Sequence, residues 1–124
     1  NKITVGAGYN LVKLSMKAAN ESLTGLEFAS GIPGTVGGAI YMNAGAYKSD
    51  MGYIVESVKV LTPDLEIKKM FNKELNYHYR DSFFQKNKEY IILEATLKLK
   101  KGKKEAILAV INDRRARRIA SQAL

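Results

Sequence analysis

Alternation of apolar and polar residues is clearest between residues 90 and 99, in the last third of the chain. A period of two places successive side chains on opposite faces of a β-strand. We therefore predict a strand here with one apolar face. That face holds Ile91, Leu93, Ala95, Leu97 and Leu99, and the other face holds Ile92, Glu94, Thr96 and Lys98.

Two more strands are predicted at residues 54–61 and 65–71, on either side of the sequence Thr62-Pro63-Asp64. Proline and aspartate favour tight turns, so the two segments are predicted to form a hairpin. A short apolar run at residues 3–5 indicates a further strand near the start of the sequence.

Apolar residues recur at helical spacing in two segments. Asn10 is suited to cap a helix over residues 10–22. Over residues 104–120 the apolar residues form one stripe, and arginines cover the exposed side. The stripe consists of Ile107, Leu108, Ile111, Ala116 and Ile119. Since the three main strands follow one another without an intervening helix, the expected fold class is α+β, an antiparallel sheet flanked by helices.

The composition is that of one globular domain: 124 residues, 46% apolar and 26% charged. The absence of cysteine excludes a disulfide framework, a thiolate metal site and a cysteine nucleophile. His78 is the only histidine and has no carboxylate cluster beside it, so no metal site is expected. No apolar run reaches the ~18 residues of a membrane-spanning helix, and no membrane partner is expected.

Positive charge is concentrated late in the sequence. The formal net charge is +8, and the late basic residues are Lys98, Lys100, Lys101, Lys103, Lys104, Arg114, Arg115, Arg117 and Arg118. Such a cluster can neutralise phosphates, so a basic nucleic-acid-binding or interaction domain is an alternative function. A solvated face is the commoner explanation, because no aromatic residues for stacking are interleaved with the cluster after Tyr90.

Glycine is concentrated in the first half, where residues 25–52 are unusually rich in it. Exposed N–H groups in a glycine loop before a helix can hold a phosphate, and Thr35 is placed to cap such a helix. The segment matches neither a Walker loop nor a Rossmann fingerprint, because the Lys-Ser/Thr pair and the third glycine are missing. It is therefore either a tight structural turn or a nucleotide cradle.

Residues 77–84 combine a phenol, a guanidinium, a carboxylate and a hydroxyl group. Arginine suits a carboxylate or phosphate because its planar fork donates two parallel hydrogen bonds. Arg80 is therefore a candidate binding residue. The alternative is a structural loop in which Arg80 pairs with Asp81 or a neighbouring residue and the aromatic side chains fill the core.

Three motifs follow in order: GLEFASGIPGTVGGA at residues 25–39, MNAGAY at residues 42–47 and YRDS at residues 79–82. With the opening VGAG and the late arginine pair, this series resembles the family of UDP-N-acetylenolpyruvoylglucosamine reductases, flavoenzymes of bacterial peptidoglycan synthesis. The resemblance implies that residues 1–124 form a single domain, the second half of an FAD-binding module cut from a longer three-domain enzyme. The implied fold is the second FAD-binding subdomain of PCMH-type, or vanillyl-alcohol-oxidase-like, flavoproteins.

The resemblance also implies that some functional residues of the family lie outside residues 1–124. The family's first flavin loop, proton-donating serine and late catalytic glutamate fall outside this sequence. We therefore expect the chain to depend on N- and C-terminal domains and to be inactive alone. A cytoplasmic location is implied, and no nucleic-acid partner.

In the family's reaction, NADPH reduces FAD, and hydride then passes to UDP-N-acetylglucosamine enolpyruvate to give UDP-N-acetylmuramate. The motif match assigns catalysis to Arg80, which would stabilise negative charge on the substrate carboxylate, with Tyr79 beside it against the substrate. Phosphate groups of FAD or of the sugar nucleotide are expected near Arg117 or Arg118. The implied FAD-binding residues are Gly31, Ile32, Pro33, Gly34, Thr35, Gly37, Gly38, Asn43, Gly45, Ala46 and Ile92. Ile92 is either a flavin contact or part of a second core face.

Overall fold

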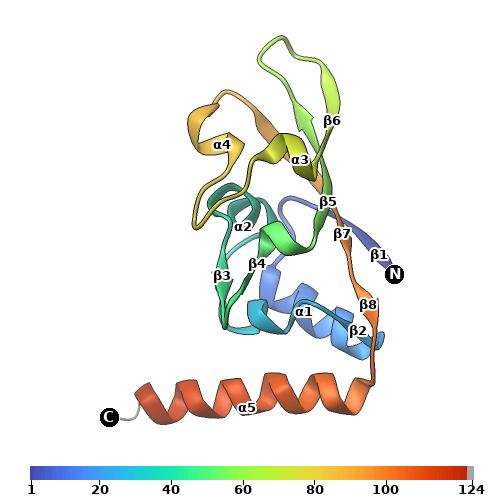
Figure 1. Cartoon of the computed structure of the whole chain (residues 1–124), viewed down its shortest axis with the longest axis vertical. Coiled ribbons are helices and arrows are strands. Elements are labelled where there is room, and N and C mark those ends of the chain that lie inside the picture. The colour runs from blue at the N-terminus through green and yellow to red at the C-terminus, as the bar shows by residue number, and fades with distance from the viewer. Residues whose placement is uncertain (123–124) are drawn as a thin grey trace.

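The computed structural model describes residues 1–122, and its centre is a four-stranded antiparallel sheet (Figure 1). In spatial order the strands are β1 (Lys2–Gly6), β7 (Ile91–Lys98), β5 (Val55–Leu61) and β6 (Ile67–Phe71). The three main predicted strands are confirmed, as is the hairpin of β5 and β6. β1 pairs with β7, so the first and last long strands of the chain lie side by side.

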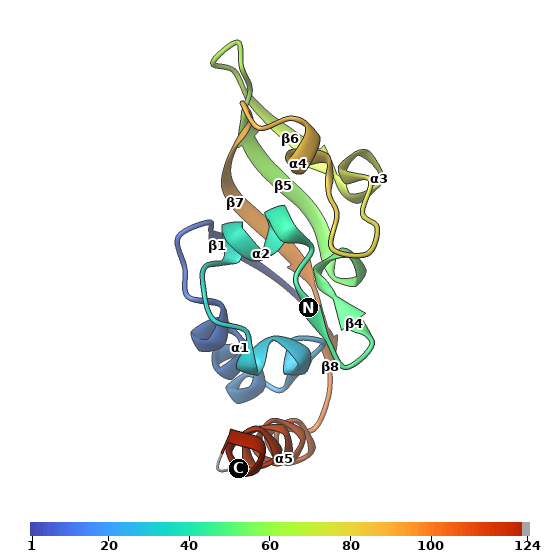
Figure 2. The ribbon, with the colours of Figure 1, turned by 90° about the vertical axis from the view of Figure 1, so that its left-hand side faces the viewer.

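Helices cover one face of this sheet (Figure 2). α1 (Leu11–Asn20) begins as predicted at Asn10, whose side chain accepts a hydrogen bond from the Lys13 N–H at 2.8 Å. α2 (Val36–Met42) lies against β7 and β1. The core is built from the inner faces of these elements, and its fully buried side chains include Leu11, Leu14, Leu26, Ile40, Met51, Val58, Phe84 and Leu97.

The last helix, α5 (Lys104–Gln122), packs on α1 and on the 3-10 helix η1 (Glu27–Gly31), and it forms an outer layer beyond α1 (Figure 1). Ile107 and Ile111 are buried against Ala19 of α1. The predicted apolar stripe is buried only in the first half of the helix, because Ile119 is 58% exposed. Most of the second half of α5 is therefore exposed to solvent.

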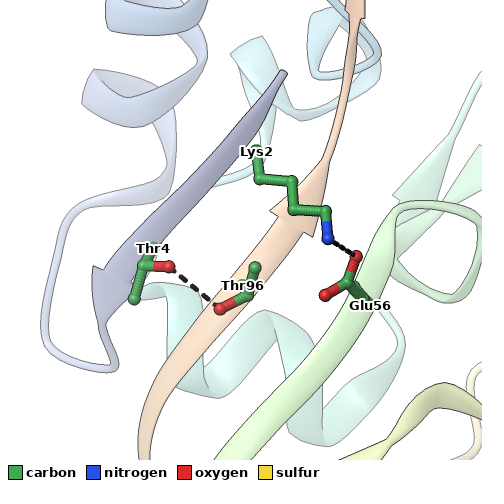
Figure 3. A network of polar contacts seen from close by, with 4 residues as sticks. All are labelled: Lys2, Thr4, Glu56 and Thr96. Carbon is green, nitrogen blue, oxygen red and sulfur yellow. Dashed lines mark hydrogen bonds and ion pairs between the residues drawn. The ribbon is translucent and has the colours of Figure 1, made fainter.

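The opposite face of the sheet is polar (Figure 3). Lys2 forms an ion pair with Glu56 at 2.7 Å, and the hydroxyl groups of Thr4 and Thr96 lie 2.9 Å apart in a hydrogen bond. The hydrogen bond from Lys2 lowers the pKa of Glu56, and the charges of nearby lysines add to this effect. An antiparallel sheet with one apolar and one solvated face is a common solution for an α+β domain.

Two β-bulges interrupt the regular pairing of β5 with β7. Lys59 pairs with Glu94 but Val60 pairs with Ile92, so Leu93 is an extra residue on β7. The bulge turns Ile92 towards the core, where it is half-buried. The predicted continuous apolar face is therefore wrong at its start, since Leu93 is 36% exposed and its neighbour Ile91 is 54% exposed.

Short elements complete the fold and position the loops. They are β2 (Leu23–Thr24), β8 (Lys100–Lys101), β3 (Gly45–Ala46), β4 (Ser49–Asp50), the 3-10 helix η2 (Met51–Tyr53), α3 (Asn72–Leu75) and α4 (Phe83–Lys86). β2 pairs with β8, and β3 pairs with β4. Within residues 1–122, none of the helices combines the length and the apolar character that crossing a membrane requires.

Candidate functional site

The glycine-rich segment forms a turn that leads into α2. The Thr35 side chain accepts a hydrogen bond from the Gly38 N–H at 3.1 Å and caps this helix, as predicted. The N–H groups of Val36 and Gly37 donate to carbonyl groups of residues 7–9 at 2.9 and 2.8 Å. These first N–H groups of α2 are thus occupied within the protein. They do not form the free phosphate cradle considered from the sequence.

Two adjoining hollows nevertheless gather most of the implied FAD-binding residues. The smaller, about 190 Å³, is lined by Ile32, Pro33, Gly34, Thr35 and Gly38, with Ala39, Met42 and Ala44. The larger, about 460 Å³, is lined by Gly31, Ile32 and Ala46, with Phe28, Ser30, Tyr47, Ser121 and three arginines of α5. Ile32 lines both hollows and therefore connects an apolar wall with a positively charged one.

The charged wall consists of Arg114, Arg117 and Arg118. Arg114 and Arg118 are half-buried and stand one turn apart on the same side of α5. The Arg114 guanidinium lies 4.1 Å from the centre of the Tyr47 ring. Arg117 is exposed and pairs with Asp113 at 3.1 Å. Both arginines implied for phosphate binding line the hollow, but Arg117 is exposed and paired with Asp113, whereas Arg118 is half-buried and stands beside Arg114.

The sequence reasoning missed Arg114, because it assigned the arginines of this helix to the exposed side. The available signal was the spacing of four between Arg114 and Arg118, which places both on the side of the helix that also carries Ile107 and Ile111.

Four of the implied FAD-binding residues line neither hollow: Gly37, Asn43, Gly45 and Ile92. A Cβ atom at Gly37 would lie 3.0 Å from the Ala7 Cβ, so this glycine allows α2 to approach the loop after β1. Asn43 is only 1% exposed, and its side chain is hydrogen-bonded inside the protein. Ile92 packs against the core, which favours the second of its two interpretations.

Arg80 adopts a left-handed backbone conformation with φ of 50°. Its Nη2 donates to the Gly45 carbonyl at 2.9 Å, and its Nη1 donates to the Asn43 carbonyl at 3.4 Å. Its guanidinium carbon lies 4.6 Å from the centre of the Tyr79 ring. The ion pairs within residues 1–122 do not include the alternative pair of Arg80 with Asp81. Arg80 is therefore held by backbone carbonyls, which leave its charge uncompensated.

Around Arg80, a hollow of about 260 Å³ is lined by residues 46–50, Tyr53 and Tyr79. The Tyr79 side chain is 82% exposed beside it. This hollow shares Ala46 and Tyr47 with the arginine-lined hollow of α5. The candidate catalytic pair therefore lies next to the candidate FAD-binding surface, although the two are far apart in sequence.

A fourth hollow, polar and about 580 Å³, also has Tyr79 in its wall, together with Asp50, Tyr77 and His78. Burial raises the pKa of Tyr77, and the negative charge of Asp50 raises it further. The phenol therefore stays protonated and donates a hydrogen bond to the Ile40 carbonyl at 3.1 Å. Its role is to anchor residues 76–80 to α2.

Ser82 also anchors the Arg80 segment. Its hydroxyl donates to the Tyr41 carbonyl at 2.6 Å and accepts from the Phe84 N–H at 3.2 Å. The backbones of His78 and Asp81 exchange two hydrogen bonds of 3.1 Å and close the turn that carries Arg80. The turn is thus supported from both ends.

Comparisons with known proteins agree with this arrangement. The family described as "FAD binding domain" matches residues 1–70. A crystal structure of UDP-N-acetylenolpyruvylglucosamine reductase from Thermus caldophilus is 38% identical, superposes with a TM-score of 0.84, and aligns with 94% of this chain and 43% of its own. The predicted α+β fold of an FAD-binding subdomain is thereby confirmed.

Curated relatives carry the same name. UDP-N-acetylenolpyruvoylglucosamine reductase of Anoxybacillus flavithermus is 48% identical over 89% of this chain, and that of Lachnoclostridium phytofermentans is 50% identical over 90%. This chain spans 36% of the length of each of these relatives. The chain therefore belongs to the FAD binding domain family, and it is similar over most of its length to one segment of UDP-N-acetylenolpyruvoylglucosamine reductases.

Proposed function

We propose that this chain is part of a cytoplasmic flavoenzyme that uses NADPH and FAD to reduce UDP-N-acetylglucosamine enolpyruvate to UDP-N-acetylmuramate. The main structural observation in support of this function is the pair of hollows that share Ile32, one apolar and one lined by guanidinium groups. Similarity to reductases over most of the chain supports the same function. The proposed location follows from the reactants, since NADPH and nucleotide sugars are cytoplasmic metabolites.

The two hollows fit the chemistry of a flavin dinucleotide. Bound FAD would supply the hydride for the substrate double bond. The apolar wall of Ile32, Pro33 and Gly34 suits a flat ring system, because binding there removes apolar surface from water. Arg114 and Arg118 suit the negative diphosphate, because guanidinium groups donate paired hydrogen bonds to phosphate oxygens. Within residues 1–122 neither arginine forms an ion pair with a carboxylate.

Arg80 is proposed to bind the substrate carboxylate. A guanidinium carries five N–H donors. The carbonyls of Asn43 and Gly45 accept from only some of them, so the others are free to hold a carboxylate. Negative charge grows on that carboxylate as hydride is delivered. A cation held in place beforehand stabilises this charge without further reorganisation. The exposed Tyr79 ring covers one side of the guanidinium and offers the substrate a flat surface.

The rest of such an active site is proposed to come from other parts of the reductase, because this chain spans about a third of its relatives' length. The proton-donating serine and the late glutamate, which the family resemblance implies, are proposed to lie in those other parts. We therefore expect the 124-residue chain alone to show no NADPH-dependent turnover.

Nucleic-acid binding gains no support from the geometry. Arg114 and Arg118 face a hollow beside Tyr47 and Gly31, so they do not continue the lysine-rich surface of residues 98–104 as one exposed strip. A phosphate backbone needs an accessible row of charges.

The test uses the full-length protein that contains this chain. We expect it to purify with FAD, to reduce this FAD with one equivalent of NADPH, and to oxidise NADPH over many turnovers when the enolpyruvyl sugar nucleotide is present. Mass spectrometry should then identify UDP-N-acetylmuramate as the product. A protein that binds no FAD and reduces no enolpyruvyl sugar nucleotide, but binds single-stranded DNA tightly at physiological salt, would show that the proposal is wrong.

A further inference from the structure

Asn43 is a buried amide at the end of α2, only 1% exposed. Its Oδ1 accepts a hydrogen bond from the Gly52 N–H at 2.8 Å. Its Nδ2 donates to the His78 carbonyl at 2.6 Å and to the Asp50 carboxylate at 3.2 Å. One side chain thus joins three segments that are separate in the sequence: the end of α2, the start of η2, and the turn that carries Arg80.

The Arg80 side chain also connects the turn with the end of α2, but here the donor belongs to the turn. It reaches from that turn back to the carbonyls of Asn43 and Gly45. The Asn43 amide at the end of α2 donates to the carbonyl of His78, two residues before Arg80. Because the backbones of His78 and Asp81 are hydrogen-bonded to each other, this contact also fixes the turn that carries Arg80. The two side chains therefore form a closed clamp, in which each holds the segment that bears the other.

The local backbone explains why asparagine occupies this position. Asn43 has φ of 48° and ψ of 53°, a left-handed conformation that asparagine adopts more readily than most residues. An aspartate would place a second carboxylate beside Asp50 and would lose the donor to His78. Gly45 is also closely surrounded, since a Cβ atom there would meet the Ser49 carbonyl oxygen and the Asp50 Cβ first, and the Arg80 Nη1 at 2.8 Å.

The Asn43 amide is enclosed and hydrogen-bonded at both its oxygen and its nitrogen, so its side chain is not placed to contact a ligand. We propose that Asn43 is a positioning residue for Arg80. Its hydrogen bonds hold the Arg80 guanidinium in the orientation in which it binds the substrate carboxylate. This inference rests on the proposed function for its catalytic consequence. The clamp itself can be measured without any reaction.

The first experiment measures kcat in the full-length reductase for Asn43→Asp and Asn43→Gly, alone and combined with Arg80→Ala. Asn43→Gly permits the left-handed backbone and removes the side chain with its amide, so it serves if Asn43→Asp folds poorly. Asn72→Asp is the matched control. Asn72 is an amide that donates to the Gly52 and Val55 carbonyls at 2.9 and 2.8 Å, but it does not touch the Arg80 turn.

If Asn43 acts through Arg80, kcat falls about 10- to 100-fold in either Asn43 variant, while bound FAD and the KM for NADPH stay unchanged. Once Arg80 is alanine, the same Asn43 change lowers kcat less than about threefold further, because interacting residues are not additive. Asn72→Asp leaves kcat within about twofold. Normal kcat in Asn43→Gly, or independent losses that multiply in the double variant, overturns the inference.

The second experiment observes the Arg80 side chain by NMR in the 124-residue chain. A clamped guanidinium rotates slowly and gives separate Nη–H signals, which we expect to merge in Asn43→Gly and to remain separate in Asn72→Asp. Unchanged signals in Asn43→Gly overturn the clamp. If Arg80→Ala leaves kcat normal while these signals respond as expected, the catalytic role of Arg80 is wrong and the positioning contact stands.

Discussion

The Arg118 guanidinium occupies the space that a side chain at Gly31 would need. Its Nη1 overlaps the position that a Cβ atom on Gly31 would take. Glycine at this position therefore lets α5 bring a positive charge onto the backbone of η1, beside the hollow that we assign to the FAD diphosphate.

Gly31→Ala should displace Arg118 and weaken FAD binding by the full-length protein about 10-fold, because one charge-assisted contact to phosphate is lost. Arg118→Ala should have a similar effect. The measurement is the Kd from quenching of flavin fluorescence. Arg115→Ala is the matched control, since Arg115 is exposed on the same helix and its loss changes the net charge equally. Equal weakening by Arg115→Ala would show that only general charge matters.

The cap of α1 offers a test of local stability away from the site. Asn10 accepts a hydrogen bond from the Lys13 N–H at 2.8 Å and satisfies a donor that has no partner within the helix. Asn10→Ala should lower the free energy of unfolding by about 1 kcal/mol, whereas Asn10→Gly should cost only a few tenths. Urea unfolding of the chain measures both. Equal losses in the two variants would contradict the capping role.

The Glu56 carboxylate gives a prediction about pH. The hydrogen bond from Lys2 lowers the pKa of Glu56 in the folded chain below its ordinary value of 4.5. Stability from this pair is therefore present above pH 4.5 and is lost as pH falls through the lowered folded-state pKa. Glu56→Gln should reduce the fall of the urea midpoint at low pH, and added salt should weaken the pair because Lys2 is exposed and Glu56 is only half-buried. An identical fall in the variant would contradict the assignment.

Periodic patterns made most of the fold predictable. The strands and helices follow from alternating and helical spacing, and the caps at Asn10 and Thr35 follow from residue type. The position of Ile92 did not follow, because a bulge at Leu93 depends on pairing with β5 and leaves no mark on the alternation of one strand.

The assignment of the FAD-binding residues stays a prediction, although most of them line the two hollows that adjoin at Ile32. The motifs selected the residues that meet at Ile32, but the N–H groups expected to hold phosphate donate to the loop after β1 instead. Contacts across the fold decided this, and they cannot be read from the glycine spacing. The same holds for Asn43, whose partners at residues 50, 52 and 78 are brought to it by tertiary structure.

The last prediction concerns Arg80 in the full-length protein. Arg80→Ala should lower kcat about 10²–10³-fold and leave FAD binding nearly unchanged, because the residue acts on charge that appears in the transition state. Arg80→Lys should recover only part of this loss, since lysine keeps the charge but lacks the planar fork that can hold both a backbone carbonyl and a carboxylate. A merely structural Arg80 would behave differently. Its removal would free the carbonyls of Asn43 and Gly45, lower the Tm, and leave kcat of the folded protein intact. Measuring kcat, flavin content and Tm on the same purified variants separates the two cases, and a lowered Tm with unchanged kcat would remove Arg80 from the catalytic residues.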